Sequence, residues 1–485
     1  MRSRGVAAAA CLLLAAGGCR GGGDAEGFPS RSPAASPTSS NTLVVALVGT
    51  FSGPGAWRGD SAFRGADLGV HELNQARGDD DPVVELVTLD DAGDARTATE
   101  LVIDQAASTR TIGIVYAGPP EGLPPAEDAL AAAGIPALLC FGDLYGARLL
   151  SEHVFQVSPS YVWEARRIVR YLLQDRRYRT IGAITTDSFS GEVARRALTE
   201  ALAEVGSKLS ISELHPPEGG SYERLLGRLK RKQVEAVVVD APPPLGVATL
   251  DALEEMGASY RNTAAARIAS ARRNGNGNGN GKARAGARAR AWRPQVVGFD
   301  GLFAPFPEDS VPPPGTAVAA SYARGAHYLP VPSFRSFRQA YLDWWESEPL
   351  EWERPAYEAV QMIGWARNNT AGRGDSAATL ETLRGLRFGG LDVTFGPEDH
   401  ASIDEAAVGL WVVPRPGAAP EAAQLPRELP WVPLGRGFSR DGVTTAIAPE
   451  DWRFLFRGRP HAKSPPPPIA RARFGVRSGR ADPVH

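Results

Sequence analysis

Cysteine is scarce in this chain, with three residues among 485. Two of them, Cys11 and Cys19, lie near the N-terminus and would be removed or modified if the protein is exported. Cys140 then has no intramolecular partner, which excludes the disulfide framework of many small secreted domains. Because apolar residues flank Cys140, we expect it in a hydrophobic core and not as a nucleophile.

Signatures of catalysis are also missing. The sequence has no Gly-x-Ser-x-Gly elbow, no His-Glu-x-x-His pair and no phosphate-binding Gly-x-x-x-x-Gly-Lys loop. The acidic run 90–94 lacks the spacing and final Glu of a calcium loop, so we expect its carboxylates in turns and helix caps. The histidines are scattered without metal-ligand spacing: His71, His153, His215, His327, His400, His461 and His485. We therefore predict no catalytic residue, no metal site and no cofactor, and a lipid-anchored hydrolase is the least favoured functional hypothesis.

No segment reaches the roughly 20 apolar residues of a membrane span. The N-terminus instead has two arginines before a short apolar stretch, the pattern of a secretory signal over residues 1–18. The stretch ends in Ala16-Gly17-Gly18-Cys19, which resembles a bacterial lipobox with Ala16 in place of the usual Leu. The resemblance implies acylation of Cys19, with residues 19–41 as a flexible tether, and a lipoprotein on the outer face of the cell membrane. Secretion with an unmodified Cys19 is the alternative.

Net charge is small, at −2 for the whole chain and −4 once Arg2 and Arg4 leave with the signal. By itself this implies no polyanionic partner, and no nucleic acid is expected. Residues 261–293 nevertheless form a basic low-complexity insertion around an Asn-Gly repeat. The insertion could dock on nucleic acid or anionic lipid, but a disordered surface loop is favoured because no aromatics are interleaved. Residues 418–485, rich in Pro and Arg, are expected to be a C-terminal extension.

Hydrophobic residues make up 43% and charged residues 22% of the chain, which indicates two or three globular units. Short β-branched runs alternate with amphipathic helices, a pattern that predicts parallel sheets covered on both faces. The alternation stops after 139 and restarts, which predicts two doubly wound lobes with ligands at the carboxyl ends of their strands. Strands are expected at 43–48, 83–87, 111–115, 135–139, 180–183, 208–212 and 236–239, and helices at 61–76, 97–107, 124–133, 162–174, 192–205, 222–230 and 246–255.

Several motifs resemble the type I periplasmic solute-binding proteins, above all the branched-chain amino-acid receptors of ABC transporters. They are Leu47-Val48-Gly49-Thr50-Phe51-Ser52-Gly53-Pro54-Gly55-Ala56, Arg64-Gly65-Ala66, Asn74, Asp90-Asp91-Ala92-Gly93-Asp94, Ala133-Gly134-Ile135-Pro136 and Pro355-Ala356-Tyr357-Glu358-Ala359-Val360. The resemblance implies a Venus flytrap, in which two lobes joined by a hinge close on a ligand. It places lobe 1 at 42–157 and 323–400, and lobe 2 at 158–322 and 401–417.

The resemblance also implies a ligand site, at which several residue types of this chain differ from those of the family. The amino-acid receptors bind the ligand carboxylate through hydroxyls and amides after the third strand, where this chain has Gly118 followed by two prolines that remove amide donors. Asp143 replaces a threonine of the family and would repel a carboxylate. The family's ammonium-binding acid and ligand-capping aromatic match Asp300 and Phe189.

Three further residues complete the expected ligand site. Trp57 and Arg58 stand at the position of an aromatic on the first lobe, and Phe141 forms a second aromatic wall. An ammonium-bearing or hydroxyl-rich solute fits this set better than a standard amino acid, although Arg58 could still anchor a carboxylate. For each residue a structural role is the alternative: Phe141 in the core, the aspartates as helix caps, and Arg58 in solvent.

These features predict capture of a small solute by hinge closure and its delivery to an ABC permease. A degenerate flytrap that senses a ligand, or serves as a scaffold at the membrane, is the second hypothesis, because prolines fill the loop after Gly118. In both cases closure follows from ligand contacts with both lobes, which shift an open–closed equilibrium.

Overall fold

A computed structural model describes the chain from the first strand to near the end of the family-like region. The described residues are 42–144, 151–216, 220–242, 245–253, 255–256, 292–302, 316–321, 332–347, 349, 353–370, 374–383, 386–388, 391–393, 395–396, 400–401, 408–413 and 432–433. The predicted signal, Cys19, the tether, residues 261–291 of the basic insertion and all but two residues of the extension lie outside them.

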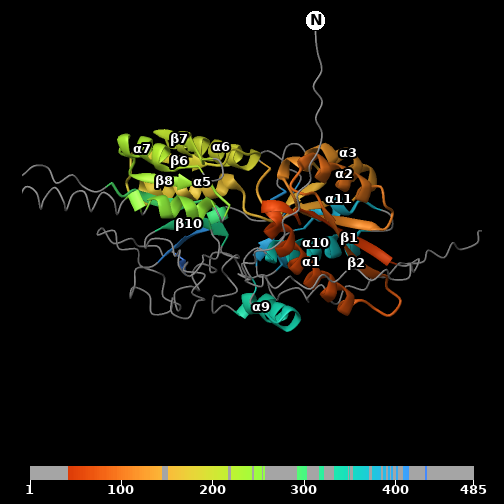
Figure 1. Ribbon diagram of the computed structural model, residues 1–485. Coiled ribbons are helices and arrows are strands. Elements are labelled where there is room, and N and C mark those ends of the chain that lie inside the picture. The colour runs from red at the N-terminus through yellow and green to blue at the C-terminus, as the bar shows by residue number, and fades with distance from the viewer. Residues whose placement is uncertain are drawn as a thin grey trace, which may run out of the picture. The chain divides into compact units, whose positions relative to one another are not determined.

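The first sheet is wholly parallel, with the strand order β2-β1-β3-β4-β5. Helices connect its strands, as a parallel arrangement requires. Figure 1 shows this sheet's β1 and β2 with α1 beside them. Its strands are β1 (Thr42–Gly49), β2 (Val83–Asp90), β3 (Thr111–Ala117), β4 (Ala137–Leu139) and β5 (Val154–Gln156). The connecting segments are η1 (Gly53–Gly55), α1 (Ala56–Ala76), α2 (Ala95–Ala106), η2 (Pro120–Gly122), η3 (Pro124–Ala126) and α3 (Glu127–Ala133).

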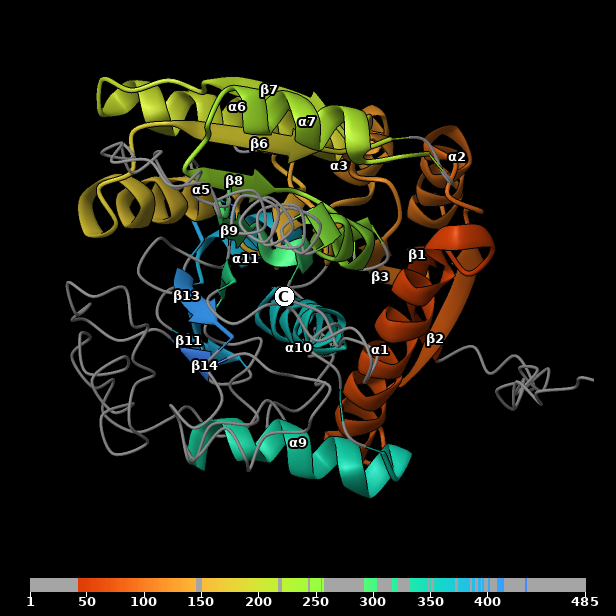
Figure 2. The same cartoon turned by 60° about the vertical axis from the view of Figure 1, so that its left-hand side comes forward.

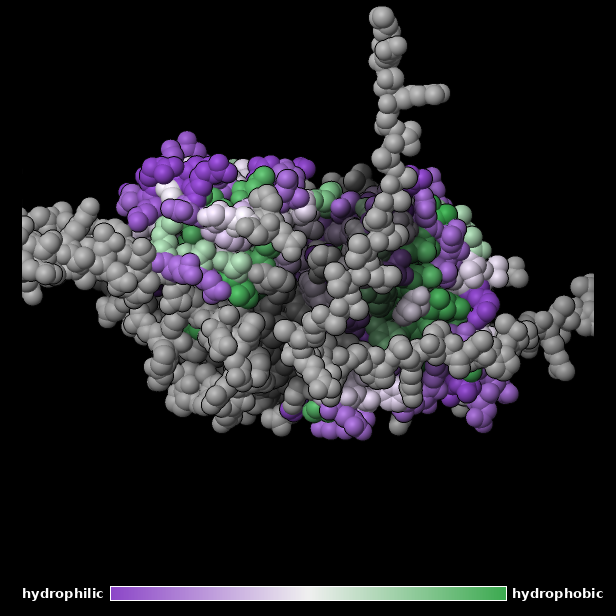
Figure 3. All heavy atoms as spheres, viewed as in Figure 1, coloured by the Kyte–Doolittle hydropathy of each residue, from purple (hydrophilic) through white to green (hydrophobic). Residues whose placement is uncertain are grey.

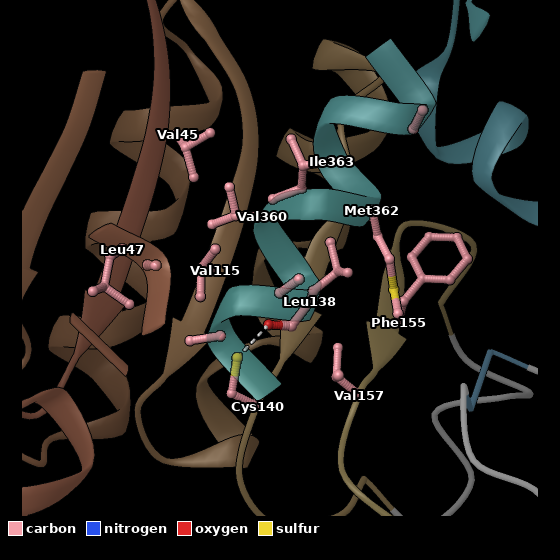
Figure 4. Close-up of a cluster of buried hydrophobic side chains, with 14 of the residues drawn as sticks. Val45, Leu47, Val115, Leu138, Cys140, Phe155, Val157, Val360, Met362 and Ile363 are labelled. Carbon is pink, nitrogen blue, oxygen red and sulfur yellow. Dashed lines mark hydrogen bonds between the residues drawn. The ribbon is translucent and has the colours of Figure 1, made fainter. Parts of the chain in front are cut away.

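Side chains of β1 alternate between two apolar cores because successive residues of a strand point to opposite faces. Val45 and Leu47 pack with residues of α1 and with α10 (Arg354–Asn369) and α11 (Ser376–Glu381). Figure 4 shows Val360 and Ile363 of α10 lying over Val115 in this core. Val44, Ala46 and Val48 pack with α2 and α3 on the other face. Burial on both faces explains why the strands read as continuous apolar runs.

The second sheet is mixed, with the strand order β14-β13-β10-β9-β8-β6-β7. The five strands from β10 to β7 are parallel, whereas β13 is antiparallel to β10 and to β14. The strands are β6 (Ile181–Thr185), β7 (Ile211–Leu214), β8 (Ala236–Val239), β9 (Gln295–Gly298), β10 (Ala317–Ser321), β13 (Val408–Val412) and β14 (Val432–Pro433). Two residues of the C-terminal extension therefore extend this sheet.

Helices also cover the second sheet on both faces. One face packs against α5 (Tyr161–Arg170) and α6 (Phe189–Glu204), and the other against α7 (Glu223–Arg231) and the helical segment 245–253. Figure 2 shows α6 and α7 beside β6 and β7. A π-helical turn, η4 (Tyr171–Asp175), extends α5. Hydrophilic side chains cover the outer surface over α6 and α7 in Figure 3, as expected of helices that bury only one stripe.

The chain returns to the first lobe after β10. Helix α9 (Pro332–Trp345) contacts α1, and α10 packs along α1 and over β3. A short hairpin follows, β11 (Leu386–Phe388) with β12 (Leu391–Val393). Two segments that connect the lobes run side by side, because the Gln156 backbone N–H donates to the His400 carbonyl at 2.8 Å and Gln156 forms a parallel bridge with Ala401.

These observations confirm the predicted fold of two α/β lobes built on parallel sheets, although β13 and β14 make the second sheet mixed. Among the described residues, none of the helices is both long enough and apolar enough to cross a membrane.

Candidate ligand-binding site

The edge of lobe 1 is built on the loops that follow β1, β2 and β3. Thr50 donates its hydroxyl to Asp91 Oδ1 at 2.7 Å, and the Gly93 backbone N–H donates to the same oxygen. Asp90 accepts from the Phe51 backbone N–H, and Asp94 accepts from the Thr97 backbone N–H as the N-cap of α2. The acidic run 90–94 thus serves turns and a helix cap, as expected from the sequence.

The Asp91 side chain also packs against Gly118. Its side chain is fully buried, and among the described residues its Oδ2 has no hydrogen-bond partner. A Cβ built on Gly118 would lie only 2.1 Å from this oxygen. The Asp91 carboxylate therefore occupies the space that a side chain at position 118 would need.

The predicted residues Trp57, Arg58 and Phe141 lie together. The Trp57 and Phe141 rings are 5.9 Å apart, and the Arg58 guanidinium lies 5.5 Å from the Trp57 ring centroid. Phe141 is buried and packs in the lobe 1 core, which is the structural role given as the alternative for it. Arg58 is half-buried, and its Nε has no hydrogen-bond partner among the described residues.

Asp143 follows β4 and is buried at the start of α5. Its Oδ2 accepts the Ser160 hydroxyl at 2.9 Å and the Tyr161 backbone N–H at 2.7 Å. Burial, and to a smaller extent the charge of Asp300, raises the pKa of Asp143 to about 6, although these hydrogen bonds lower it. Asp143 thus accepts a backbone N–H at the start of α5, as in the helix-capping role given as the alternative, and fixes the loop after β4 to this first helix of lobe 2.

Asp300 and Asp240 lie at the carboxyl ends of neighbouring strands of lobe 2. The Phe299 backbone N–H donates to the Val239 carbonyl at 3.0 Å, which brings the two strand ends together. Asp240 is buried and accepts the Thr186 hydroxyl at 3.3 Å. Burial, and then Asp300, raises the pKa of Asp240 to about 6, whereas the Arg58 guanidinium lowers it.

Tyr161 contacts residues of both lobes, since its backbone N–H donates to Asp143 and its ring packs near Phe299, the residue before Asp300. Burial raises the pKa of its hydroxyl, and so do Asp240, Asp300, Glu164 and Asp143 in that order. Its ring lies 5.2 Å from the Phe299 ring. Glu164 is fully buried on the same helix and accepts the Asp300 backbone N–H at 2.9 Å. The site therefore combines an acid from the lobe 1 sheet edge with acids from lobe 2.

Phe189 is near the acids of this site along the chain, because Thr186, three residues earlier, donates its hydroxyl to Asp240. It begins α6, and 40% of it is exposed. It stands beside a surface pocket of about 350 Å³ at the carboxyl ends of β6 and β7. Residues from both strands and from α6 line that pocket: Thr185, Thr186, Asp187, Ser188, Glu192, Arg195, Ser212, Glu213 and Leu214.

Sequence reasoning missed Asp240, Tyr161, Glu164 and the position of Asp91. Asp240 had a usable signal, because it directly follows the apolar strand Ala236–Val239 as Asp300 follows β9. Tyr161 and Glu164 had none, since the sequence of the first turn of a helix gives no indication of which distant residues its buried face contacts. Among the described residues, no three His, Cys, Asp or Glu side chains are arranged to hold a metal ion.

The fold agrees with comparisons to known proteins. A family described as periplasmic binding protein matches residues 42–412. No curated protein matches the chain. A periplasmic binding protein type 1 from Bordetella pertussis Tohama I is 18% identical, with a TM-score of 0.58, over 78% of this chain and 98% of its own.

Two solved structures with bound molecules have the same fold. The branched-chain amino-acid transporter substrate-binding protein LivJ from Streptococcus pneumoniae, in complex with isoleucine, is 16% identical, with a TM-score of 0.56, over 77% of this chain and 95% of its own. A solute-binding protein of an ABC transporter from Rhodopseudomonas palustris BisB5, in complex with 3,4-dihydroxybenzoic acid, is 15% identical, with a TM-score of 0.58, over 77% and 92%. With the family match over most of its length, this chain belongs to the type I periplasmic binding proteins.

Proposed function

We propose that this protein is an exported, lipid-anchored substrate-binding protein that captures a small polar or amino-acid-like solute by hinge closure and delivers it to an ABC permease. The main support is a set of contacts around α5 that involves both lobes. The Tyr161 backbone N–H donates to Asp143, which follows the lobe 1 sheet, and Glu164 of the same helix accepts the Asp300 backbone N–H in lobe 2. A solute that contacts both sets of groups favours the closed form, because only closure completes its contacts. The protein binds its solute and releases it unchanged.

A ligand screen tests this proposal on the domain from residue 42 to 485. We would measure unfolding by differential scanning calorimetry with amino acids, amines, polyamines, sugars and aromatic acids, since a saturating ligand raises apparent stability by mass action. A class of solutes that raises the unfolding temperature supports the proposal. If the domain is folded and no member of the panel raises its unfolding temperature, the second hypothesis is favoured, a degenerate flytrap that serves as a sensor or scaffold.

Substitution at the site separates specific binding from a general effect. Asp300→Ala should weaken binding of any solute found by the screen without unfolding the protein, because Asp300 begins the short helical turn η5 (Asp300–Leu302) after β9 and is not part of the sheet. Asp104→Ala, an exposed change on α2, is the matched control and should leave affinity unchanged. Equal affinities for the two variants would remove Asp300 from the site.

The membrane anchor is tested separately in cells of a bacterium that processes lipoproteins. Cys19→Ser in the full chain should move the protein from the membrane fraction to the soluble extracytoplasmic fraction, because the acyl attachment point is gone. Retention of the variant in membranes would show that another segment carries the attachment.

A further inference from the structure

The last strand of the lobe 1 sheet, β5, lies between two buried histidines. His153 directly precedes the strand, and His400 lies beside it, with its ring stacked on Phe155 at 4.3 Å between centroids. The Gln156 backbone N–H donates to the His400 carbonyl at 2.8 Å, where the two segments that connect the lobes run side by side. The two histidines therefore frame a connection between the lobes.

Both ring nitrogens of His400 face hydrogen-bond acceptors. Nδ1 lies 2.9 Å from the Val154 carbonyl oxygen, and Nε2 lies 3.0 Å from Glu381 Oε1. A carbonyl can only accept, so Nδ1 carries a hydrogen. A neutral ring would then turn an unprotonated Nε2 toward a carboxylate, and no hydrogen would lie between them. The His400–Glu381 pair therefore makes both hydrogen bonds only when it holds one more proton.

His153 has the same arrangement with two carboxylates. Nδ1 lies 3.0 Å from Glu127 Oε1 of α3, and Nε2 lies 3.1 Å from Asp375 Oδ2 at the start of α11. Although burial opposes the shift, hydrogen bonding from His153 lowers the pKa of Glu127. Two ionised acceptors on opposite sides of one ring both receive a hydrogen bond only from the imidazolium form.

Helix α11 is the element that both histidines hold. Asp375, its N-cap, uses Oδ1 for the cap and turns Oδ2 toward His153. Glu381, its last residue, faces His400. Within the described part of the chain, these two acids and Glu127 are the titratable groups that contact the two rings. A short helix is thus attached at each end to a histidine beside β5, and each attachment needs a proton.

We propose that the His153–Asp375 and His400–Glu381 pairs form a proton-dependent clamp, which holds α11 to β5 and keeps the connection between the lobes closed only while both pairs are protonated. Loss of the protons as the pH rises leaves Nε2 of each ring against a carboxylate, which costs both hydrogen bonds. The Gln156–His400 backbone pairing then opens more often, because the residue that supplies its carbonyl is no longer held. The clamp belongs to the fold and does not depend on the solute.

Hydrogen–deuterium exchange of the full chain, read by mass spectrometry, tests the clamp from about pH 6, below the ordinary histidine pKa of about 6.5, to about pH 8.5. After correction for the intrinsic exchange rate, protection of the segment 152–157 should fall about fivefold or more toward the upper end, because local opening becomes easier. Strand β8 of the lobe 2 sheet is the internal control and should change less. An equal change in both segments would come from global stability and would contradict the clamp.

Two amide substitutions separate the proton from the contact. Asp375→Asn and Glu381→Gln put an amide N–H in place of the oxygen that faces each ring, and this group donates to an unprotonated Nε2. Because Asn also serves as an N-cap, α11 keeps its start. The double variant should protect the segment 152–157 about equally across the pH range. His71→Asn on α1 is the control and should keep the wild-type dependence. If the double variant also keeps it, the proposal is overturned.

A third substitution gives the open state of the clamp. In His400→Asn the amide N–H can still donate to the Val154 carbonyl, but the shorter side chain does not reach Glu381. Protection of the segment 152–157 should therefore be low already at about pH 6 and change little as the pH rises. Wild-type protection of this variant at about pH 6 would show that the Glu381 contact holds nothing, which contradicts the proposal.

Discussion

Two buried aspartates of the site, Asp143 and Asp240, lower the stability of the folded state at neutral pH. Asp143 and Asp240 have pKa values of about 6, above the ordinary 3.8, chiefly because burial disfavours their ionised forms. The folded state therefore binds protons more tightly than the unfolded chain between these values. Stability contributed by these groups is highest below about pH 4 and declines as the pH rises to about 6.

Asp240→Asn should therefore stabilise the ligand-free domain at about pH 8, by about 1–3 kcal/mol, since a shift of one pKa unit corresponds to about 1.4 kcal/mol. Urea unfolding of wild type and variant measures the difference. The gain should shrink at about pH 4.5, where the aspartate is protonated in the fold. A loss of stability at about pH 8 would mean that the hydrogen bond from Thr186 outweighs the cost of burying the charge.

His153 shows the opposite electrostatic situation in lobe 1. It is buried between two carboxylates, with Nδ1 3.0 Å from Glu127 and Nε2 3.1 Å from Asp375. Hydrogen bonding to Glu127, and then to Asp375, raises the pKa of His153 in spite of desolvation. A raised histidine pKa contributes stability that is fully present below about pH 6.5 and is lost as the pH rises through the folded value.

His153→Gln should reduce stability at about pH 6 by about 1.5–3 kcal/mol, the range for hydrogen bonds to charged groups. The difference should become smaller as the pH rises through the raised pKa of the wild-type histidine and the ring loses its charge. Unfolding midpoints of both proteins across this range provide the measurement. A difference that does not change with pH would show that the histidine acts by shape alone.

At the scale of elements, the packing of α1 against α10 matters most for lobe 1. Helices α1 and α10 approach closely because glycines stand at their contact. A Cβ on Gly65 would lie 1.8 Å from the Glu353 carbonyl oxygen, and one on Gly69 would lie 2.9 Å from Val360. Gly364 of α10 meets Leu73 in the same way. The contact fixes the returning helix α10 on the outer face of the lobe 1 core.

Gly65→Ala should destabilise the domain by about 2 kcal/mol or more, because the backbone oxygen of Glu353 cannot move aside without shifting α10. Gly227→Ala on α7 is the matched control, since its nearest neighbour would be the flexible end of Arg231 at 3.6 Å. The control should gain about 0.5–1 kcal/mol from helix propensity. Calorimetry of both variants measures the change in stability. A Gly65→Ala variant as stable as the wild type would contradict the close packing.

Elements of the first half were predictable because each strand is an apolar run that pairs close to its place in the sequence. Predicted helix ends were less accurate, since caps decide them. Helix α6 begins at Phe189 and not at 192, because Ser188 accepts the Gly191 backbone N–H as its N-cap. Strands β10 and β13 were not predicted. They pair with each other across a long stretch of chain, which a local pattern does not record.

At the scale of the whole molecule, two lobes and their strand-end site followed from the repeat of one pattern along the chain. The site could be predicted only in part, since Asp143 and Asp300 follow strands, whereas Tyr161 and Glu164 lie on a helix whose position depends on tertiary packing. The hydrogen bonds from Ser160 and Tyr161 to Asp143 place the acid at the connection between the lobes. The domain boundaries and the ligand contacts of each residue stay predictions.

Cys140 has a practical consequence at this scale. It is the single cysteine between residues 42 and 485, it is fully buried, and burial raises the pKa of its thiol. Ellman's reagent should find no reactive thiol in the native domain and one in the unfolded domain. Cysteines introduced at the exposed positions Asp104 and Arg224 would then be the sole sites for maleimide dyes. Energy transfer between the two dyes would report lobe closure on solute binding with the native cysteine left in place.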